Sequence, residues 1–187
     1  MALNKNEFMV KNFTISKGSL DVNDQFVGEV YSYTKTGETS VEFTKEYAEF
    51  LDGVPSGVVR KDLTSKRMKV MAQIPQFDVE KIQDILGGKL VSDPNYEGYQ
   101  RLNIGSDEEC LVEYAWMLAG EIIDCVNGNR EFIIMIRVGK IITETATLQA
   151  SGTDHLVLPL SIEAFEDPTI SDPTGNLGFI LIQDVIS

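Results

Sequence analysis

The sequence has very few of the residues from which zinc sites, disulfide frameworks and catalytic triads are built. Its 187 residues include one histidine and two cysteines. A zinc site needs several cysteine or histidine ligands, and His155 has no such companions. Cys110 and Cys125 are too few for a disulfide framework, and a turn expected at Ala119–Gly120 would leave them out of register. We therefore expect both cysteines to be small buried hydrophobic residues.

Motifs of common enzyme classes are also missing. The sequence contains no glycine-rich phosphate loop and no G-x-S-x-G nucleophile motif. The adjacent acids Asp107–Glu109 point different ways on a strand or loop, so we expect a solvated turn there and keep a hydrolase as a remote alternative. Asp21, Asn23 and Asp24 begin like a calcium loop, but the later glycine and glutamate are missing. We predict a protein that is not an enzyme and has no catalytic, metal-binding or cofactor-binding residues.

Long apolar runs and excess positive charge are lacking as well. No run of about 18 apolar residues could span a membrane, and the N-terminal stretch MALNKNEFMVKNF has no apolar core typical of a signal peptide. We expect a soluble protein made in a cytoplasm. The net charge of −13 argues against tight binding to nucleic acid, which needs lysine and arginine at the phosphates. On composition alone, the acidic balance indicates little more than solubility.

What the sequence does contain is alternation of apolar and polar residues with a period of two, which is typical of half-buried strands. The apolar face of HLVLPLSIEAF is predicted to hold Leu156, Leu158, Leu160, Ile162 and Ala164, and that of Lys66–Ile74 to hold Met68, Val70, Ala72 and Ile74. Pro159 cannot donate to a ladder, so it predicts a sheet edge or a bulge. Arg130–Val138 is apolar on both faces and is predicted to be a central strand.

Turn-forming clusters separate these segments from further candidate strands. The further strands are expected at Asn12–Ser16, Phe26–Tyr33, Thr39–Thr44, Cys110–Leu118, Ile141–Gln149 and Leu177–Ile182. Since no repeat or linker divides the chain, residues 1–187 are predicted to form a single domain that is mainly β.

One helix is predicted at about residues 78–87. Asp78 is a good N-cap, Phe77 and Ile82 have the spacing of a hydrophobic staple, and Gly87 or Gly88 can end the helix. Its apolar stripe consists of Val79, Ile82, Ile85 and Leu86, which predicts that the helix packs on the sheet.

The segment 38–70 is predicted to form an extended arm. Residues 21–52 contain eight acids and two bases, whereas residues 60–69 contain five bases and one acid. An isolated hairpin is marginal in water, and the pattern places little apolar surface toward the tip, so something else must hold this arm. Either the charges protect an edge from aggregation, or they dock on a neighbouring copy. The candidate interface residues are Glu38, Glu42, Glu46, Glu49, Asp52, Arg60, Lys61, Lys66, Arg67 and Lys69.

The order of these elements resembles the tail tube (major tail) proteins of tailed bacteriophages and, more distantly, the inner-tube proteins of contractile injection systems. The resemblance covers nearly the whole chain and depends on the order of its parts. The matching parts are GEVYSY with the polar strand after it, the FLDGVP loop, KRMKVMAQIP leading into FDVEKIQDILGG, FIIMIRVGKI, VLPLSIEAFEDP and the late NLGFILI.

The resemblance implies an antiparallel two-sheet β-sandwich or barrel with one packed helix and a long protruding hairpin. It implies a structural protein of the virion that assembles in the bacterial host cytoplasm into stacked six-membered rings. In that family the strands of all subunits form a continuous barrel around a channel for DNA ejection, and the long hairpin reaches neighbouring subunits or rings. The implied partners are further copies and other tail proteins, namely the tape measure, the tail terminator and the baseplate or tip.

An acidic channel wall would deny DNA the cation contacts that cause sticking. We therefore expect acids of the region 28–42, with Glu29, Glu38 and Glu42 as candidates, to face the channel, and Arg60–Lys69 to lie away from it. The alternative is a monomeric β-sandwich module that binds a ligand such as a carbohydrate. In that case Tyr96, Tyr99, Tyr114 and Trp116 would line a cleft, although aromatic residues on strands are more often core.

Overall fold

The computed structural model describes residues 9–34, 39–52, 57–75, 78–104, 112–123, 129–142, 157–171 and 175–184. Within these residues the protein is mainly β, with a large antiparallel sheet and one short helix. The strands are β1 (Met9–Leu20), β2 (Phe26–Tyr33), β3 (Thr39–Asp52), β4 (Gly57–Ile74), β5 (Lys89–Ser92), β6 (Gln100–Asn103), β7 (Tyr114–Ile123), β8 (Arg130–Ile141), β9 (Leu158–Phe165) and β10 (Gly178–Ile182), and the helix is α1 (Val79–Leu86).

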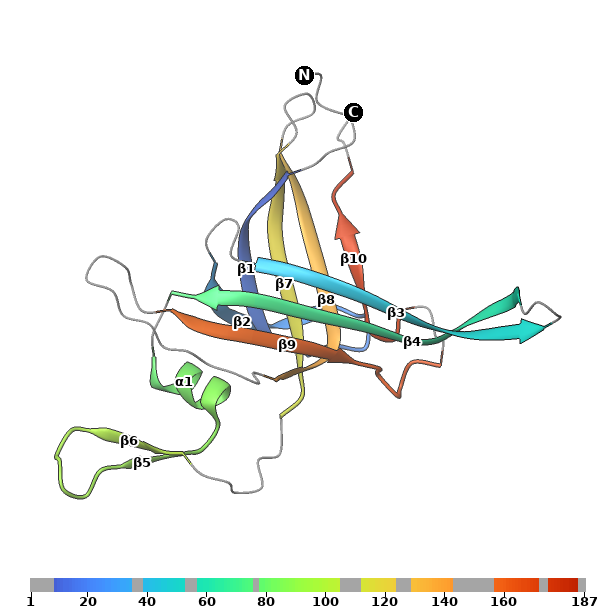
Figure 1. Ribbon diagram of the computed structural model, residues 1–187. Coiled ribbons are helices and arrows are strands. Elements are labelled where there is room, and N and C mark those ends of the chain that lie inside the picture. Colours follow the sequence, from blue (N-terminus) through green and yellow to red (C-terminus); the bar gives the residue numbers. More distant parts are fainter. Residues whose placement is uncertain are drawn as a thin grey trace, which may run out of the picture.

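The large sheet has eight strands in the order β2-β1-β7-β8-β9-β4-β3, with β10 also paired to β8, and it is not closed. One edge of β8 is shared by two strands, because Phe132–Ile136 pairs with β10 whereas Val138–Ile141 pairs with β9. Beyond this fork, β9, β4 and β3 cross over β1, β7 and β8 (Figure 1). The two parts of the sheet therefore face each other across one hydrophobic core.

The core confirms the alternation predicted for two strands. Leu158, Leu160, Ile162 and Ala164 of β9 and Met68, Val70, Ala72 and Ile74 of β4 are all buried. Pro159 lies opposite Gln73 of β4. On the other side of β9, the described pairing with β8 covers only Ile162–Phe165 and does not reach the proline. The missing N–H of Pro159 therefore leaves no described residue of β8 without a donor. β8 is a central strand, as its apolar composition predicts.

Trp116 of β7 lies at the centre of this core and is fully buried. Its indole Nε1 donates a hydrogen bond to the carbonyl oxygen of Gly139 on β8 at 3.1 Å. Tyr31 of β2 packs edge-on against the indole, with 5.3 Å between ring centroids. The buried indole thus has both an apolar environment and a partner for its one polar group.

The predicted helix is confirmed as α1. The side chain of Asp78 accepts a hydrogen bond from the backbone N–H of Lys81 at 2.8 Å. Gly87 ends the helix at φ 71° and donates its N–H to the carbonyl oxygen of Gln83. Ile85 is buried, and Ile82 and Leu86 pack against the core, so the apolar stripe covers one end of the sheet. Phe77, the predicted staple partner, lies outside the described residues.

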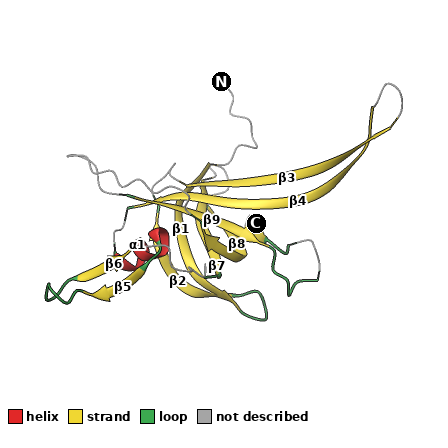
Figure 2. Ribbon diagram, turned by 60° about the horizontal axis from the view of Figure 1, so that its bottom comes forward, coloured by secondary structure: helices red, strands yellow, loops and turns green. Residues whose placement is uncertain are grey.

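Strands β3 and β4 form a hairpin that extends far beyond the body of the protein (Figure 2). The two strands pair from Thr39↔Ala72 to Asp52↔Gly57, whereas β4 pairs with β9 only over Lys69–Ile74. Residues 43–52 and 57–68 are called the arm from here on. Among the described residues, the arm has no further strand beside it.

The structure corrects several predicted boundaries. No turn occurs at Ala119–Gly120, because β7 continues through both residues and pairs there with Ile133 and Phe132 of β8. The strand predicted from Cys110 begins at Tyr114, and the one predicted from Ile141 is only the last residue of β8 within the described part. The short β5–β6 hairpin was not predicted. Several predicted residues lie outside the described residues, namely Cys110, Cys125, Asp107–Glu109, His155, Leu156 and residues 143–149.

Candidate functional site

The arm has two chemically different faces. Residues directly opposite each other in a sheet share a face, and on the face that continues the core the pairs are Val41↔Val70, Phe43↔Met68, Lys45↔Lys66 and Tyr47↔Leu63. Met68 and Val70 are buried, but farther out Phe43, Tyr47 and Leu63 are 57%, 52% and 42% exposed. These three side chains are called the apolar face of the arm. They extend the apolar surface of the core outward with nothing covering it in the described part of the chain.

The charged residues of the arm pair largely with one another. Glu46 lies 3.6 Å from Arg67 and accepts a hydrogen bond from the Ser65 hydroxyl at 2.9 Å. Nearer the tip, Glu49 pairs with Lys61 at 2.5 Å. The acidic and basic blocks of the sequence are therefore the two strands of one hairpin, which accounts for their opposite signs within a single chain.

The remaining candidate interface residues lie along the same hairpin. Arg60 pairs with Asp62 at 2.5 Å, and Glu42 lies opposite Lys69 in the β3–β4 register. Lys66 lies opposite Lys45, so one pair of like charges interrupts the apolar face. Asp52 ends β3, and Glu38 lies outside the described residues. Contact of these residues with another copy stays a prediction.

An apolar groove of about 400 Å³ lies between the base of the arm and β10. The arm contributes Phe43, Lys66 and Met68, and the other wall consists of Gly175–Ile180. The sequence alone did not predict this groove. The groove forms only because β10 pairs with β8 and so lies next to the base of the hairpin.

Arg137 of β8 holds the β10 wall in place. Its guanidinium donates to both carboxylate oxygens of Asp24, at 2.5 and 2.8 Å, and its Nε donates to the carbonyl oxygen of Gly175 at 2.9 Å. The hydrogen bond with Arg137 lowers the pKa of Asp24, and the same bond raises the pKa of Arg137. The Asp21 carboxylate accepts hydrogen bonds from the N–H groups of Asn23 and Gln25, each at 2.8 Å. The acids of this turn therefore fix its shape.

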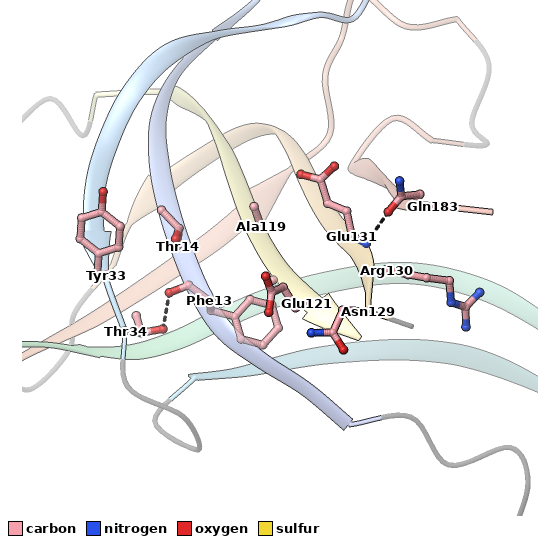
Figure 3. A pocket seen from close by; sticks show the side chains of 11 residues that line it. Phe13, Thr14, Tyr33, Thr34, Ala119, Glu121, Asn129, Arg130, Glu131 and Gln183 are labelled. Atoms are coloured by element: carbon pink, nitrogen blue, oxygen red, sulfur yellow. Dashed lines mark hydrogen bonds between the residues drawn. The ribbon is translucent and has the colours of Figure 1, made fainter. Parts of the chain in front are cut away.

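The face of β1, β7 and β8 turned away from the core has a hollow of about 680 Å³ (Figure 3). Glu121 of β7 lies directly opposite Glu131 of β8, and both are exposed. The backbone N–H of Glu131 donates to the Gln183 side chain at 3.0 Å. This surface is called the open face of the sheet, and it carries two acids that the sequence analysis did not select.

The predicted channel acids are not brought together. Glu29 of β2 lies opposite Lys17 of β1, and Lys17 bonds Asp84 of α1 at 2.7 Å. Glu29 therefore shares the face that turns toward the helix and the core. Glu42 lies on β3, on the other side of the core. Neither residue lies on the open face, which has Glu121 and Glu131 instead.

The aromatic residues proposed for a binding cleft are also separated. Trp116 is fully buried, so it cannot contact a ligand, and Tyr114 packs against it at 6.2 Å. Tyr96 and Tyr99 form an edge-to-face pair at 6.1 Å between β5 and β6 and are 66% and 69% exposed. The four residues do not line one cleft.

A partly buried ionisable cluster anchors the helix. Lys17 bonds Asp84 and lies over the rings of Tyr31 and Tyr114, at 5.1 and 4.6 Å from their centroids. Burial, followed by the charge of Asp84, raises the pKa of Tyr31, so its phenol stays neutral. These contacts stabilise the position of α1 and offer no open site.

Neither a metal site nor a membrane span is found in the part of the chain described. No cluster of three or more histidine, cysteine or acidic side chains is placed there to hold a metal ion, and no helix there has the length and apolarity to cross a membrane. Comparison with models of known protein families and with curated protein sequences finds no match for this chain.

Proposed function

We propose that this protein is a structural subunit that assembles head to tail with further copies into rings, which stack into a tail tube of the phage type. The observation that carries the proposal is the uncovered apolar face of the arm. In this proposal the subunit is a two-layer β-sandwich, with β2-β1-β7-β8 as one layer and β9-β4-β3 as the other. It is not an enzyme.

Apolar burial is the expected source of affinity. Exposed ion pairs contribute roughly 0 to 1 kcal/mol each, and four charged residues of the arm already have partners in the hairpin, namely Glu46 with Arg67 and Glu49 with Lys61. Full burial of a large apolar side chain contributes about 1.5 to 3 kcal/mol, and Phe43, Tyr47 and Leu63 are all about half exposed. A long hairpin with such a face is stabilised best by another protein surface.

A second copy is the occupant that the resemblance to tail tube proteins implies. The arm belongs to β3 and β4 at one end of the sheet order, whereas β2 is at the other end. Contacts between unlike surfaces are heterologous, and they close into rings or continue as filaments. In the proposed virion, the tube also contacts the other tail proteins, namely the tape measure, the tail terminator and the baseplate or tip.

Passage of DNA without binding agrees with the charge of the chain. Each copy has a net charge of −13, and the open face carries Glu121 and Glu131. The hollow there is also lined by Arg130, so two acids face one base, and this wall gives the phosphates few cations to replace their counterions. We propose the open face as the wall of the channel, in place of Glu29 and Glu42, which lie on other surfaces. Glu38 lies outside the described residues.

Sedimentation velocity tests the proposal with variants of the two arm faces. The wild type is expected to sediment as large assemblies, and the variant Phe43→Ser, Tyr47→Ser, Leu63→Ser as a folded monomer, because exposed serines need no cover. The matched control is Ser40→Ala, Thr44→Ser, Met71→Ser on the opposite face of the hairpin, which is expected to assemble like the wild type. A monomeric wild type, or equal assembly of both variants, would contradict the proposal.

The alternative is a monomeric module that binds a ligand such as a carbohydrate. The exposed pair of Tyr96 and Tyr99 favours it, because tyrosine rings at the tip of a hairpin can contact sugar rings. Thermal shift against a panel of glycans separates the two functions. Stabilisation of a monomer that is lost in Tyr96→Ala, Tyr99→Ala supports the alternative, and no shift with any glycan removes it.

A further inference from the structure

We propose that the apolar groove between the base of the arm and β10 binds a single-chain amphiphile with an anionic head group, namely a fatty acid. The acyl chain would lie in the groove, and the carboxylate would lie between Lys45 and Lys66 at the outer end of the groove. This site goes beyond the proposed function and does not depend on it, because the groove and both lysines belong to one chain.

The groove has the size and the walls of a site for an apolar chain. Its volume of about 400 Å³ lies in the lower part of the range of about 300 to 1,000 Å³ that is typical of small-molecule sites. Phe43 and Met68 of the hairpin line one side, and Leu177 and Ile180 line the other. Phe43 is 57% exposed and Ile180 is 47% exposed, so both sides keep apolar surface for a ligand. Figure 1 shows the hairpin crossing near the start of β10, where one acyl chain would contact both sides.

Two lysines at the outer end of the groove have no acid to pair with. Lys66 lines the groove, and Lys45 lies directly opposite it on the same face of the hairpin. Arg60, Lys61 and Arg67 of the arm each have an acidic partner. Neither Lys45 nor Lys66 has an ion pair with any residue that the structure describes. Like charges directly opposite each other destabilise a sheet, so a carboxylate between the two ammonium groups would remove this repulsion.

The order of the side chains along the hairpin determines the direction of the ligand. Residues two apart on a strand share a face and lie about 7 Å from each other. Lys45 and Lys66 are therefore one such step farther from the body than Phe43 and Met68. Both lysines are exposed. The acyl chain would thus point toward the core, and the carboxylate would stay in contact with water, which a buried charge would lose.

The charges of the site favour an anionic head group over a neutral or cationic one. Hydrogen bonds from an ammonium group to a carboxylate are shorter and stronger than those between neutral groups. A neutral amphiphile would leave Lys45 and Lys66 unpaired, and a cationic one would be repelled. Lys66 is the one charged residue among the described residues that line the groove, so no acid there competes with the ligand.

Titration calorimetry with dodecanoate and with its neutral glycerol ester, both below their micelle concentrations, tests the site. The wild type is expected to bind one dodecanoate per chain and to bind the ester roughly tenfold more weakly, because the ester makes neither exposed ion pair. Lys45→Gln, Lys66→Gln is expected to bind both ligands with the weaker affinity. The matched control Arg67→Gln, Lys69→Gln removes two cations from the opposite face of the hairpin and is expected to keep the preference.

Two variants of β10 test the position of the acyl chain. Ile180 and Leu181 are 47% and 49% exposed and, as neighbours on a strand, lie on opposite faces. Ile180→Gln places an amide in the groove and is expected to weaken both ligands severalfold, whereas Leu181→Gln is expected to bind like the wild type. Decanoate is expected to bind the wild type roughly tenfold more weakly than dodecanoate, because it buries two fewer CH₂ groups. If thermal unfolding shows that Ile180→Gln does not fold, Phe43→Ser on the other side of the groove replaces it.

Several outcomes would overturn the site. They are no binding of dodecanoate by the wild type, equal affinity for dodecanoate and the ester, and an equal loss of preference in the lysine variant and its control. Tighter binding to phosphatidylglycerol vesicles than to dodecanoate would also do so, since the lysines would then serve a membrane surface. A wild type that assembles but binds no dodecanoate removes the site alone, whereas a monomeric wild type that binds dodecanoate removes only the proposed function.

Discussion

Arg137 connects three separate parts of the chain through one side chain. It bonds Asp24 in the β1–β2 turn and the carbonyl oxygen of Gly175 before β10, and it lies 5.3 Å from the ring centroid of Phe179. Asp24 holds its place at φ 61°, a conformation that asparagine also tolerates. This one residue therefore ties both the β1–β2 turn and the segment before β10 to β8.

The ion pair predicts a specific acid dependence of stability. Because the pKa of Asp24 is lowered in the folded state, the pair stabilises the fold above the unfolded pKa of about 3.9. The contribution is lost as the pH falls through the lower folded value. Asp24→Asn is expected to lower the urea midpoint at pH 7. Between pH 4 and pH 2 the urea midpoint is expected to fall less in this variant than in the wild type, because the variant has no carboxylate there to protonate. Parallel wild-type and variant curves of midpoint against pH would contradict this role.

A second residue-scale prediction concerns the contact of Gly139 with the core tryptophan. A Cβ added at Gly139 would lie 2.6 Å from Cδ1 of Trp116. The indole is fully buried and cannot move away without breaking its hydrogen bond. Gly139→Ala is expected to lower the free energy of unfolding by about 1 to 3 kcal/mol, as overpacking does. Chemical denaturation measures it, with Thr44→Ala on the exposed hairpin as the control that changes little.

At the scale of elements, α1 depends on its N-cap. The Asp78 carboxylate accepts from the Lys81 backbone and pairs with the Lys81 ammonium at 2.8 Å. Asp78→Ala is expected to lower the free energy of unfolding by about 1 kcal/mol, because one backbone donor of the first turn loses its partner. Asp78→Ser keeps an acceptor and is expected to restore most of the loss. Equal loss in both variants would mean that the carboxylate charge, rather than the cap, matters.

The ion pair across the outer half of the arm gives a prediction about local stability. Glu49 and Lys61 lie opposite each other in one hairpin. Lys61→Glu places two acids together and is expected to speed amide exchange in the outer half of the arm, and the added change Glu49→Lys is expected to reverse it. The interaction free energy between Glu49 and Lys61 should be below about 1 kcal/mol, since the pair is exposed. It should not vary with protein concentration, because both partners belong to one chain. Coupling that vanishes on dilution would place the partners in different copies.

Elements were predictable where burial enforces one periodicity. β2 and α1 agree closely with their predicted ranges, and the buried faces of β4 and β9 are those read from alternation. β3 and β4 are longer than the strands predicted there. The prediction stopped short because bulges at Glu46/Tyr47 and Phe50/Leu51 interrupt the alternation of apolar and polar residues along the arm. The β5–β6 hairpin buries too little apolar surface to leave a pattern, so tertiary placement decides it.

At the scale of the whole molecule, the surfaces that matter were the least predictable. The sequence shows an arm with unlike charge blocks, and the structure pairs those blocks within the hairpin and places Phe43, Tyr47 and Leu63 on one uncovered face. Counting charges along the chain conceals that face, because its members alternate with acids. The open face with Glu121 and Glu131 depends on the register of two strands, which composition cannot reveal.

The central claim is that identical copies cover the apolar faces of one another's arms. Negative-stain electron microscopy of the purified wild-type protein, over a rising range of concentrations, tests it most directly. Closed rings with a central opening, alone or stacked into tubes, are the predicted result. Compact single particles at every concentration, with no closed assembly, would contradict it.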